Sequence, residues 1–145
     1  MSSGAQTPCR FTLSLLTDTM SSLVHCLLSQ DDLYLVFEKQ PMRVFRLLRT
    51  TGSFSAAFDA EAILGPYVTD LAGLHFVSRT RTLLVLSQES KKIVQITPEG
   101  RVVGAPMSVE AARQPEGVVL SQDEETLYII GEPNELHVYE KRTNR

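Results

Sequence analysis

The chain has 145 residues, with 14 Lys and Arg against 17 Asp and Glu, and carries a net charge of −3. This length suits one domain, and a hydrophobic share of 43% argues against a largely disordered chain. The slight acidity argues against a general nucleic-acid binder, and no apolar run reaches the roughly 18 residues of a membrane-spanning helix.

Residues 1–9 form a polar leader, which we expect to be disordered and which lacks the apolar stretch of a signal peptide. Cys9 and Cys26 are too few for a disulfide framework, so we expect two reduced thiols. These features together suggest a cytoplasmic protein.

After the leader come short apolar runs of strand length, rich in Val, Ile, Leu, Tyr and Phe, which predict an all-β protein. Polar turns separate them, for example Thr97–Gly100 and Ser121–Glu125. Two stretches are candidates for short helices, Ala56–Leu64 and Val109–Arg113. In chain order the apolar runs are Phe11–Leu16, Leu23–Leu28, Leu33–Phe37, Val44–Leu48, Leu74–Val77, Leu83–Leu86, Ile93–Ile96, Val118–Leu120, Leu127–Ile130 and Leu136–Tyr139.

The chain contains an internal repeat of strand pairs. Its copies begin at Leu33, Leu83 and Leu127, so they are 50 and then 44 residues apart, as expected for four-stranded propeller blades. The first and third copies align without a gap across both strands. The aligned segments are Leu33–Lys39 with Leu127–Pro133 and Met42–Phe45 with Leu136–Tyr139, and the second copy supplies Leu83–Gln88 and Ile93–Ile96.

We therefore predict an all-β fold of about three four-stranded antiparallel propeller blades in residues 10–145, with blades near 11–60, 68–105 and 114–142. The middle strand of each copy is apolar almost throughout, so we expect both of its faces to be buried between stacked sheets. Closed propellers usually have at least four blades, and three blades leave two open faces. The chain is then part of a longer protein, self-associates to close the ring, or caps its ends irregularly.

Several segments, in their order and spacing, resemble the SdiA-regulated propeller family of bacteria over residues 29–142. The resemblance implies a five-bladed propeller, distantly similar to NHL-repeat propellers, with a calcium site, a place at the bacterial cell envelope and no established activity. The chain differs from the family's pattern at Gln88, where the family tends to have Asp, and at Ala72, where it tends to have Ser. It also lacks a membrane or signal segment, and its length fits only the later blades. The segments that carry the resemblance are Asp70–Phe76, Leu83–Ser90, Gln114–Val118 and Leu127–Asn134, and Glu38–Pro41 looks like the family's earlier blade.

Three carboxylates, Asp70, Glu116 and Glu132, are the candidate metal ligands. Glu116 stands at the start of an inner strand, near the central channel, and Asp70 lies near the corresponding position of the preceding blade. Calcium takes about six to eight oxygen ligands, so these groups, together with the resemblance, predict a calcium ion at the channel. The alternative is that Asp70 and Glu116 are solvated turn residues or accept backbone hydrogen bonds. Glu132 shares its repeat position with Glu38 and Gln88, a set that either lines a rim or ties the neighbouring turns.

No catalytic motif accompanies these carboxylates. The three histidines do not recur at equivalent positions or pair at zinc-ligand spacing, and no nucleophile elbow, phosphate loop or dinucleotide fingerprint is present. We therefore expect a non-enzymatic binding or scaffold module with calcium at the channel and a protein or small-molecule partner. The alternative is a metal-dependent hydrolase of the lactonase or phosphoesterase type, in which a cation polarises the substrate and a carboxylate acts as base. A third interpretation is a truncated product without activity of its own.

Overall fold

A computed structural model describes residues 23–28, 32–38 and 41–141. Its strands form three antiparallel sheets in which each strand pairs with the next along the chain. The predicted strand Phe11–Leu16 and the predicted leader lie outside the described residues. The first sheet contains β1 (Leu23–Leu28), β2 (Asp32–Phe37), β3 (Arg43–Leu48) and β4 (Phe54–Phe58); the second contains β5 (Gly73–Val77), β6 (Thr82–Ser87), β7 (Lys92–Ile96) and β8 (Met107–Ser108); the third contains β9 (Gln114–Leu120), β10 (Thr126–Glu132) and β11 (Glu135–Glu140).

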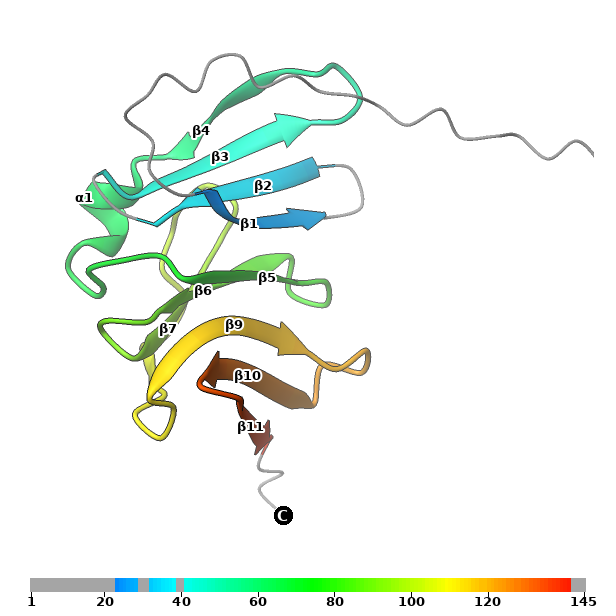
Figure 1. Ribbon diagram of the computed structural model, residues 1–145. Helices are drawn as coiled ribbons and strands as arrows, with labels where there is room; N and C mark the ends of the chain where they lie inside the picture. The colour runs from blue at the N-terminus through cyan, green and yellow to red at the C-terminus, as the bar shows by residue number, and fades with distance from the viewer. Residues whose placement is uncertain (1–22, 29–31, 39–40, 142–145) are drawn as a thin grey trace, which may run out of the picture.

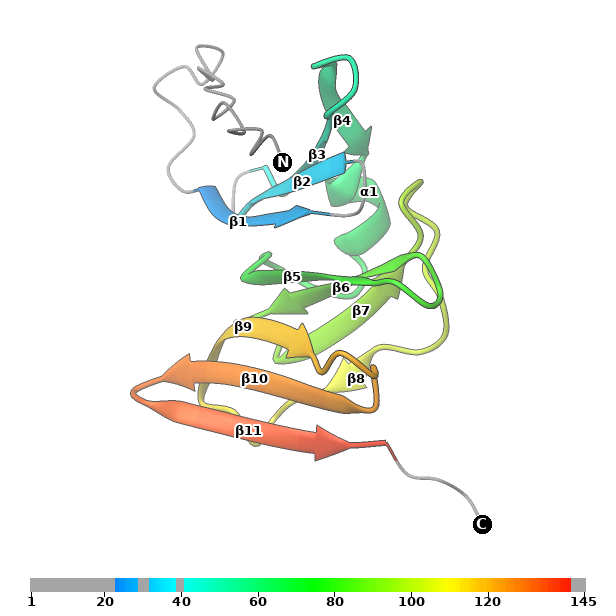
Figure 2. The same ribbon diagram turned by 90° about the vertical axis from the view of Figure 1, so that its right-hand side faces the viewer.

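The three sheets are stacked face to face in chain order (Figure 1). Their first strands lie side by side, because β5 contacts both β1 and β9. This is the arrangement of propeller blades around an axis lined by their first strands, and it confirms the predicted all-β, propeller-type fold. The sheets form an open arc rather than a closed ring (Figure 2). In the described part of the chain, no helix is both long and apolar enough to span a membrane.

The sequence repeat corresponds to equivalent strands, with one correction. The copies beginning at Leu33, Leu83 and Leu127 become β2, β6 and β10, the second strand of each sheet. The third strands are offset, since Val36 pairs with Val44, eight residues later, whereas Ile130 pairs with Leu136, six residues later. The alignment without a gap is therefore wrong by two residues in β3 and β11, because the connection before β3 is longer. An even offset leaves the same side chains on the same face of the sheet.

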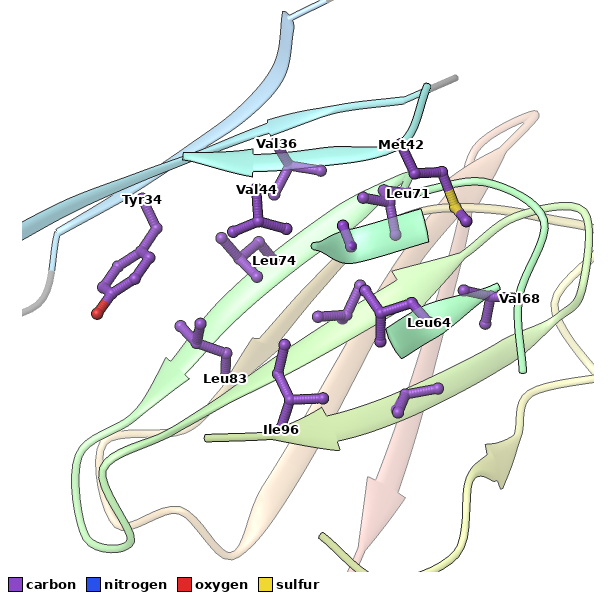
Figure 3. Close-up of a cluster of buried hydrophobic side chains, with 13 residues drawn as sticks. Tyr34, Val36, Met42, Val44, Leu64, Val68, Leu71, Leu74, Leu83 and Ile96 are labelled. Atoms are coloured by element: carbon purple, nitrogen blue, oxygen red, sulfur yellow. The ribbon is translucent and has the colours of Figure 1, made fainter. Parts of the chain in front are cut away.

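A hydrophobic core lies between the first and second sheets (Figure 3). Val36 and Val44 enter it from the first sheet, Leu83 enters it from the second, and all three are fully buried. The short helix α1 (Ala60–Leu64) adds Leu64 to this core. The predicted helix Ala56–Leu64 is correct only for these last five residues. Earlier in that stretch, Ala56 and Phe58 belong to β4 and pair with β3.

A second core lies between the second and third sheets, where Leu86 and Ile93 meet Ile129 and neighbouring side chains. Val109 and Ala112 are buried in it too, but the predicted helix Val109–Arg113 is wrong. These residues form an irregular turn in which the N–H of Ala112 donates to the carbonyl of Val109 at 3.0 Å. This turn buries both apolar side chains without a helix.

The outer sheets differ in their outward faces. In β10 the side chains alternate between buried and exposed, so the expectation that both faces of each middle strand are buried is wrong for the third sheet. In the first sheet the side chains opposite the core are buried as well, since Leu35, Phe37 and Leu47 are only 3%, 4% and 7% exposed. Among the described residues of the two outer sheets, large exposed apolar side chains lie only on the outward face of the third sheet. The third sheet also contains three described strands rather than the predicted four.

Candidate functional site

Asp70 lies immediately before the second sheet and is fully buried. Its Oδ1 accepts hydrogen bonds from the Ser87 hydroxyl and from the N–H of Glu89 at 3.1 Å, and its Oδ2 accepts one from the N–H of Gln88 at 3.2 Å. The Ser87 hydroxyl in turn accepts from the N–H of Ser90 at 3.0 Å. The carboxyl group therefore fastens the turn after β6 to the segment that leads into β5.

The residues after Asp70 connect the first two sheets. The N–H of Leu71 donates to the carbonyl of Glu38 at 3.1 Å, and the N–H of Ala72 donates to the carbonyl of Leu86 at 2.7 Å. Both apolar side chains are buried. Gly73 follows, and a Cβ atom there would lie 3.3 Å from the Leu86 side chain, so this glycine permits the close packing of β5 against β6. Asp70 thus occupies a junction where backbone from both sheets converges.

Gln88 joins two of the three predicted metal ligands. Its backbone N–H contacts Asp70, while its side-chain Nε2 donates to Oε1 of Glu116 at 2.8 Å. Glu132 is exposed at the end of β10, opposite Gln114. Within the described ranges, no three His, Cys, Asp or Glu side chains are grouped so that they could hold a metal ion. The structure therefore brings Asp70 and Glu116 to a common neighbour and does not add Glu132 to them.

This arrangement does not fit a calcium ion held by the predicted ligands. Calcium needs about six to eight oxygen atoms, and N–H and O–H donors already occupy three acceptor positions of Asp70. Between Asp70 and Glu116 stands Gln88, which turns an amide donor toward the second carboxylate. The geometry gives both residues a structural role, because Asp70 holds the turn after β6 and Glu116 accepts a hydrogen bond that links the second and third sheets. Calcium binding stays a prediction of the sequence.

Calcium at millimolar concentration is expected to leave the melting temperature of the purified chain unchanged, because a bound ion would have to displace these hydrogen bonds. The measurement is thermal unfolding followed by circular dichroism, with calcium and with a chelator. The Glu116→Gln variant is measured in parallel. A calcium-dependent rise in the wild type that disappears in this variant would contradict the expectation and identify Glu116 as a ligand.

A cavity of about 440 Å³ lies between the second and third sheets. Its apolar lining includes Leu84, Ile93 and Leu127, and charged side chains stand at its rim. We call this cavity the outer groove. Sequence reasoning missed it because its walls come from separate repeats.

Arg79 connects the two walls at the rim of the outer groove. Its N–H donates to Glu124 at 3.0 Å, and its guanidinium donates to Glu125 at 3.1 Å and to the carbonyl of Asp123 at 2.8 Å. Arg79 stands in the turn between β5 and β6, and the acidic residues stand in the equivalent turn between β9 and β10. Opposite charges in equivalent turns of successive repeats were the signal that could have identified this contact.

Two titratable groups beside the third sheet have shifted pKa values. Burial lowers the pKa of His75, whose Nε2 accepts the N–H of Leu120 at 3.4 Å. The N–H of Arg113, the ring of His137 and the Arg113 guanidinium lower the pKa of Glu135 to about 2. The stabilisation from the Glu135 carboxylate is therefore present above its ordinary pKa and is lost as the pH falls toward 2. Both groups fasten β9 or β11 to neighbouring segments, and neither faces a candidate substrate site.

Comparison with known proteins agrees with this architecture. The model of a protein family described as SdiA-regulated matches residues 27–140. Hydrazine synthase from Kuenenia stuttgartiensis is similar in structure with a TM-score of 0.62 at 14% identity, covering 91% of this chain and 36% of that one. A catalytically inactive virginiamycin B lyase from Staphylococcus aureus, with quinupristin, gives 0.54 at 12% identity, covering 89% and 44%. The computationally designed protein Ika4 gives 0.51 at 8% identity, covering 81% and 64%.

These likenesses establish the fold alone, because the sequence identities are low. The similar structures are β-propeller proteins, as the stacked sheets of this chain lead one to expect. In each case the chain spans less than two thirds of the length of the protein it resembles.

Proposed function

Because the chain belongs to the SdiA-regulated family and folds into propeller-type sheets, we propose that it is a non-catalytic protein-binding module whose open sheet face packs against a second copy of the chain. The open face is the outward side of the third sheet. It consists of Val119, Tyr128, Ile130, Leu136 and Val138, which lie in register across β9, β10 and β11.

The observation that carries the proposal is a difference in burial at equivalent positions. Val36 in β2 and its partner Val44 in β3 are both fully buried against the second sheet. Their equivalents in the third sheet, Ile130 and its partner Leu136, are 55% and 63% exposed. Val119 and Val138 are also largely exposed. The outward face of the third sheet therefore carries apolar side chains at the positions that are buried in the first sheet. No described element packs on this face.

A further β-sheet is the kind of surface that fits the open face, because both sheet interfaces within the chain pair flat apolar faces in this way. Exposed apolar patches of this kind mark sites of protein association. At the opposite end of the stack, Leu35 and Phe37 are buried. A second copy can therefore cover the open face with its own open face, in a closed two-fold dimer.

The hydrolase alternative has no observation in its favour. A metal-dependent hydrolase needs ligands for the ion and a further group to act as base. Asp70 accepts hydrogen bonds within the second sheet, and Glu116 accepts one that links the second and third sheets. A protein-binding role depends instead on the open face.

Sedimentation equilibrium at micromolar concentrations is expected to show a dimer for the wild type. Combining Val119→Lys with Ile130→Lys is expected to raise the dimer dissociation constant more than about a hundredfold, because each dimer would bury unpaired ammonium groups. Both positions are exposed within the chain, at 41% and 55%, so the fold is retained, as circular dichroism will check.

The matched control is Val103→Lys, which places a lysine at an apolar residue that is 38% exposed between β7 and β8. This variant is expected to dimerise like the wild type. A wild type that stays monomeric throughout the concentration range would overturn the proposal, and so would equal dissociation in the control.

A further inference from the structure

His75 lies at the interface between the second and third sheets. Its neighbours in β5, Leu74 and Phe76, pack into the core shared with the first sheet. Because successive side chains of a strand point to opposite faces, His75 faces the third sheet. Gly73 is on the same face of β5, and a Cβ atom there would lie 3.5 Å from the carbonyl oxygen of Glu116 in β9. The His75 ring is therefore directed at the first strand of the third sheet.

The imidazole of His75 accepts a hydrogen bond from the backbone of β9. Its Nε2 lies 3.4 Å from the nitrogen of Leu120, whose N–H is the donor. Nε2 can accept only when the ring is neutral and carries its proton on Nδ1. Protonation places a second N–H on the ring, so that two donors face each other and the hydrogen bond is lost. The contact between the two sheets at this point therefore depends on the charge of one side chain.

The surroundings of His75 oppose its protonation. The ring is half-buried, and burial lowers its pKa because an imidazolium ion loses hydration there. Glu124, in the turn between β9 and β10, acts in the opposite direction and is the weaker influence. Its carboxylate already accepts the N–H of Arg79 at 3.0 Å and lies 3.7 Å from the Arg79 guanidinium. The neighbouring side chains from β6 and β9, Leu84 and Leu120, are apolar and pack on the second core.

Two further polar contacts join the same two sheets. Gln88 donates to Glu116, and Arg79 donates to Glu124, and these acceptors stand before and after Leu120 in the chain. Neither donor changes its charge between about pH 5 and about pH 8, because an amide does not titrate and a guanidinium stays protonated. Histidine is the side chain whose ordinary pKa lies in this range. The middle contact of the three is therefore the one whose donor and acceptor roles change there.

We propose that His75 forms a pH-sensitive contact, which holds the third sheet against the second when the ring is neutral and is broken when the ring is protonated. The stabilisation is fully present above the ordinary pKa of histidine, about 6.5, and is lost as the pH falls below it, because the folded protein binds a proton at His75 less readily than the unfolded chain does. The contact lies within one chain, so its behaviour does not require a dimer.

Hydrogen exchange at the Leu120 amide, followed by NMR on the full chain, measures this contact. The measured quantity is the protection factor, which compares the exchange rate with that of an unstructured chain at the same pH. Between about pH 7.5 and about pH 5 the protection factor of Leu120 is expected to fall at least about fivefold in the wild type. The Leu120 amide resonance is expected to shift with the same midpoint as the His75 ring.

His75→Gln is the decisive variant, because its side-chain oxygen can accept the same N–H and does not titrate. The fall in the protection factor of Leu120 is expected to be less than about twofold in this variant. His75→Phe keeps a ring but removes the acceptor, so Leu120 is expected to be weakly protected already at about pH 7.5. His137→Gln is the matched control, since His137 contacts Glu135 in β11 rather than the backbone of β9. It is expected to behave like the wild type.

A fall in His75→Gln as large as in the wild type would overturn the proposal, and so would loss of the fall in His137→Gln. Constant protection of Leu120 in the wild type across this pH range would overturn it as well. If His75→Gln does not fold, His75→Phe gives the answer. Wild-type protection of Leu120 in that variant at about pH 7.5, followed by the same fall in acid, would show that the ring nitrogen does not hold the sheets together.

Discussion

Replacing Val85 by Asp is expected to remove a large part of the free energy of unfolding of the protein. Val85 is fully buried in the central strand of the second sheet, in the core shared with the first sheet. A carboxylate placed there has no partner, and burying it costs on the order of 4 kcal/mol or more. That cost approaches the roughly 5–15 kcal/mol by which a small domain is stable.

Urea unfolding followed by circular dichroism measures the effect of Val85→Asp. The control is Val119→Asp, which introduces the same side chain on the open face, where Val119 is 41% exposed. This control is expected to change the free energy of unfolding of the monomer by less than about 1 kcal/mol. If Val85→Asp unfolds at the urea concentration of the wild type, β6 is not sandwiched between two sheets and the stacked architecture is wrong.

Removing the carboxyl group of Asp70 is expected to cause the second largest loss. In Asp70→Ala the Ser87 hydroxyl and the N–H groups of Gln88 and Glu89 lose their acceptor beside a buried junction. Each unsatisfied donor costs about 1–3 kcal/mol where water cannot reach it, so we expect a loss of about 3 kcal/mol in total. Ser87→Ala removes one of these hydrogen bonds and also the acceptor of the Ser90 N–H, and is expected to cost about 2 kcal/mol.

Thermal and urea unfolding of both variants provide the measurement. The ratio of the stability losses in Asp70→Ala and Ser87→Ala shows whether Asp70 acts through several hydrogen bonds or through the one to Ser87 alone. Equal losses for Asp70→Ala and Ser87→Ala would mean that the backbone contacts of Asp70 contribute nothing. If Asp70→Ala leaves the free energy of unfolding unchanged, Asp70 is a solvated turn residue and its structural role is contradicted.

The repeat made the fold predictable. Alternating or continuous apolar runs are local signals, and their return at Leu33, Leu83 and Leu127 identified the second strand of each sheet. The polar turns between them followed from turn chemistry that is equally local. The stacking order needed only the rule that consecutive elements are usually neighbours in space.

The features of the fold and of the candidate site that could not be predicted from the sequence depend on contacts between distant segments. The apolar pattern around Ile130 is the same as around Val36, yet one residue is half exposed and the other fully buried, because burial depends on what the next sheet provides. Asp70 was a reasonable metal ligand by residue type. Its hydrogen bonds to a turn 17 to 19 residues later gave it another role. The apolar residues Val109 and Ala112 were compatible with a short helix. The sequence does not show that they are buried in a turn between the second and third sheets.

In the described part of the chain, each hydrophobic core lies between two successive sheets. The second sheet is therefore held from two sides, whereas the third is held from one. The free energy of unfolding of such a linear array is close to the sum of the stabilities of the single sheets and of the interfaces between neighbouring sheets. Another sheet can then be added on the open face of the third sheet without rearranging the sheets that are already in place. Chains built in this way can gain or lose a terminal unit through a single genetic event and still keep a folded remainder.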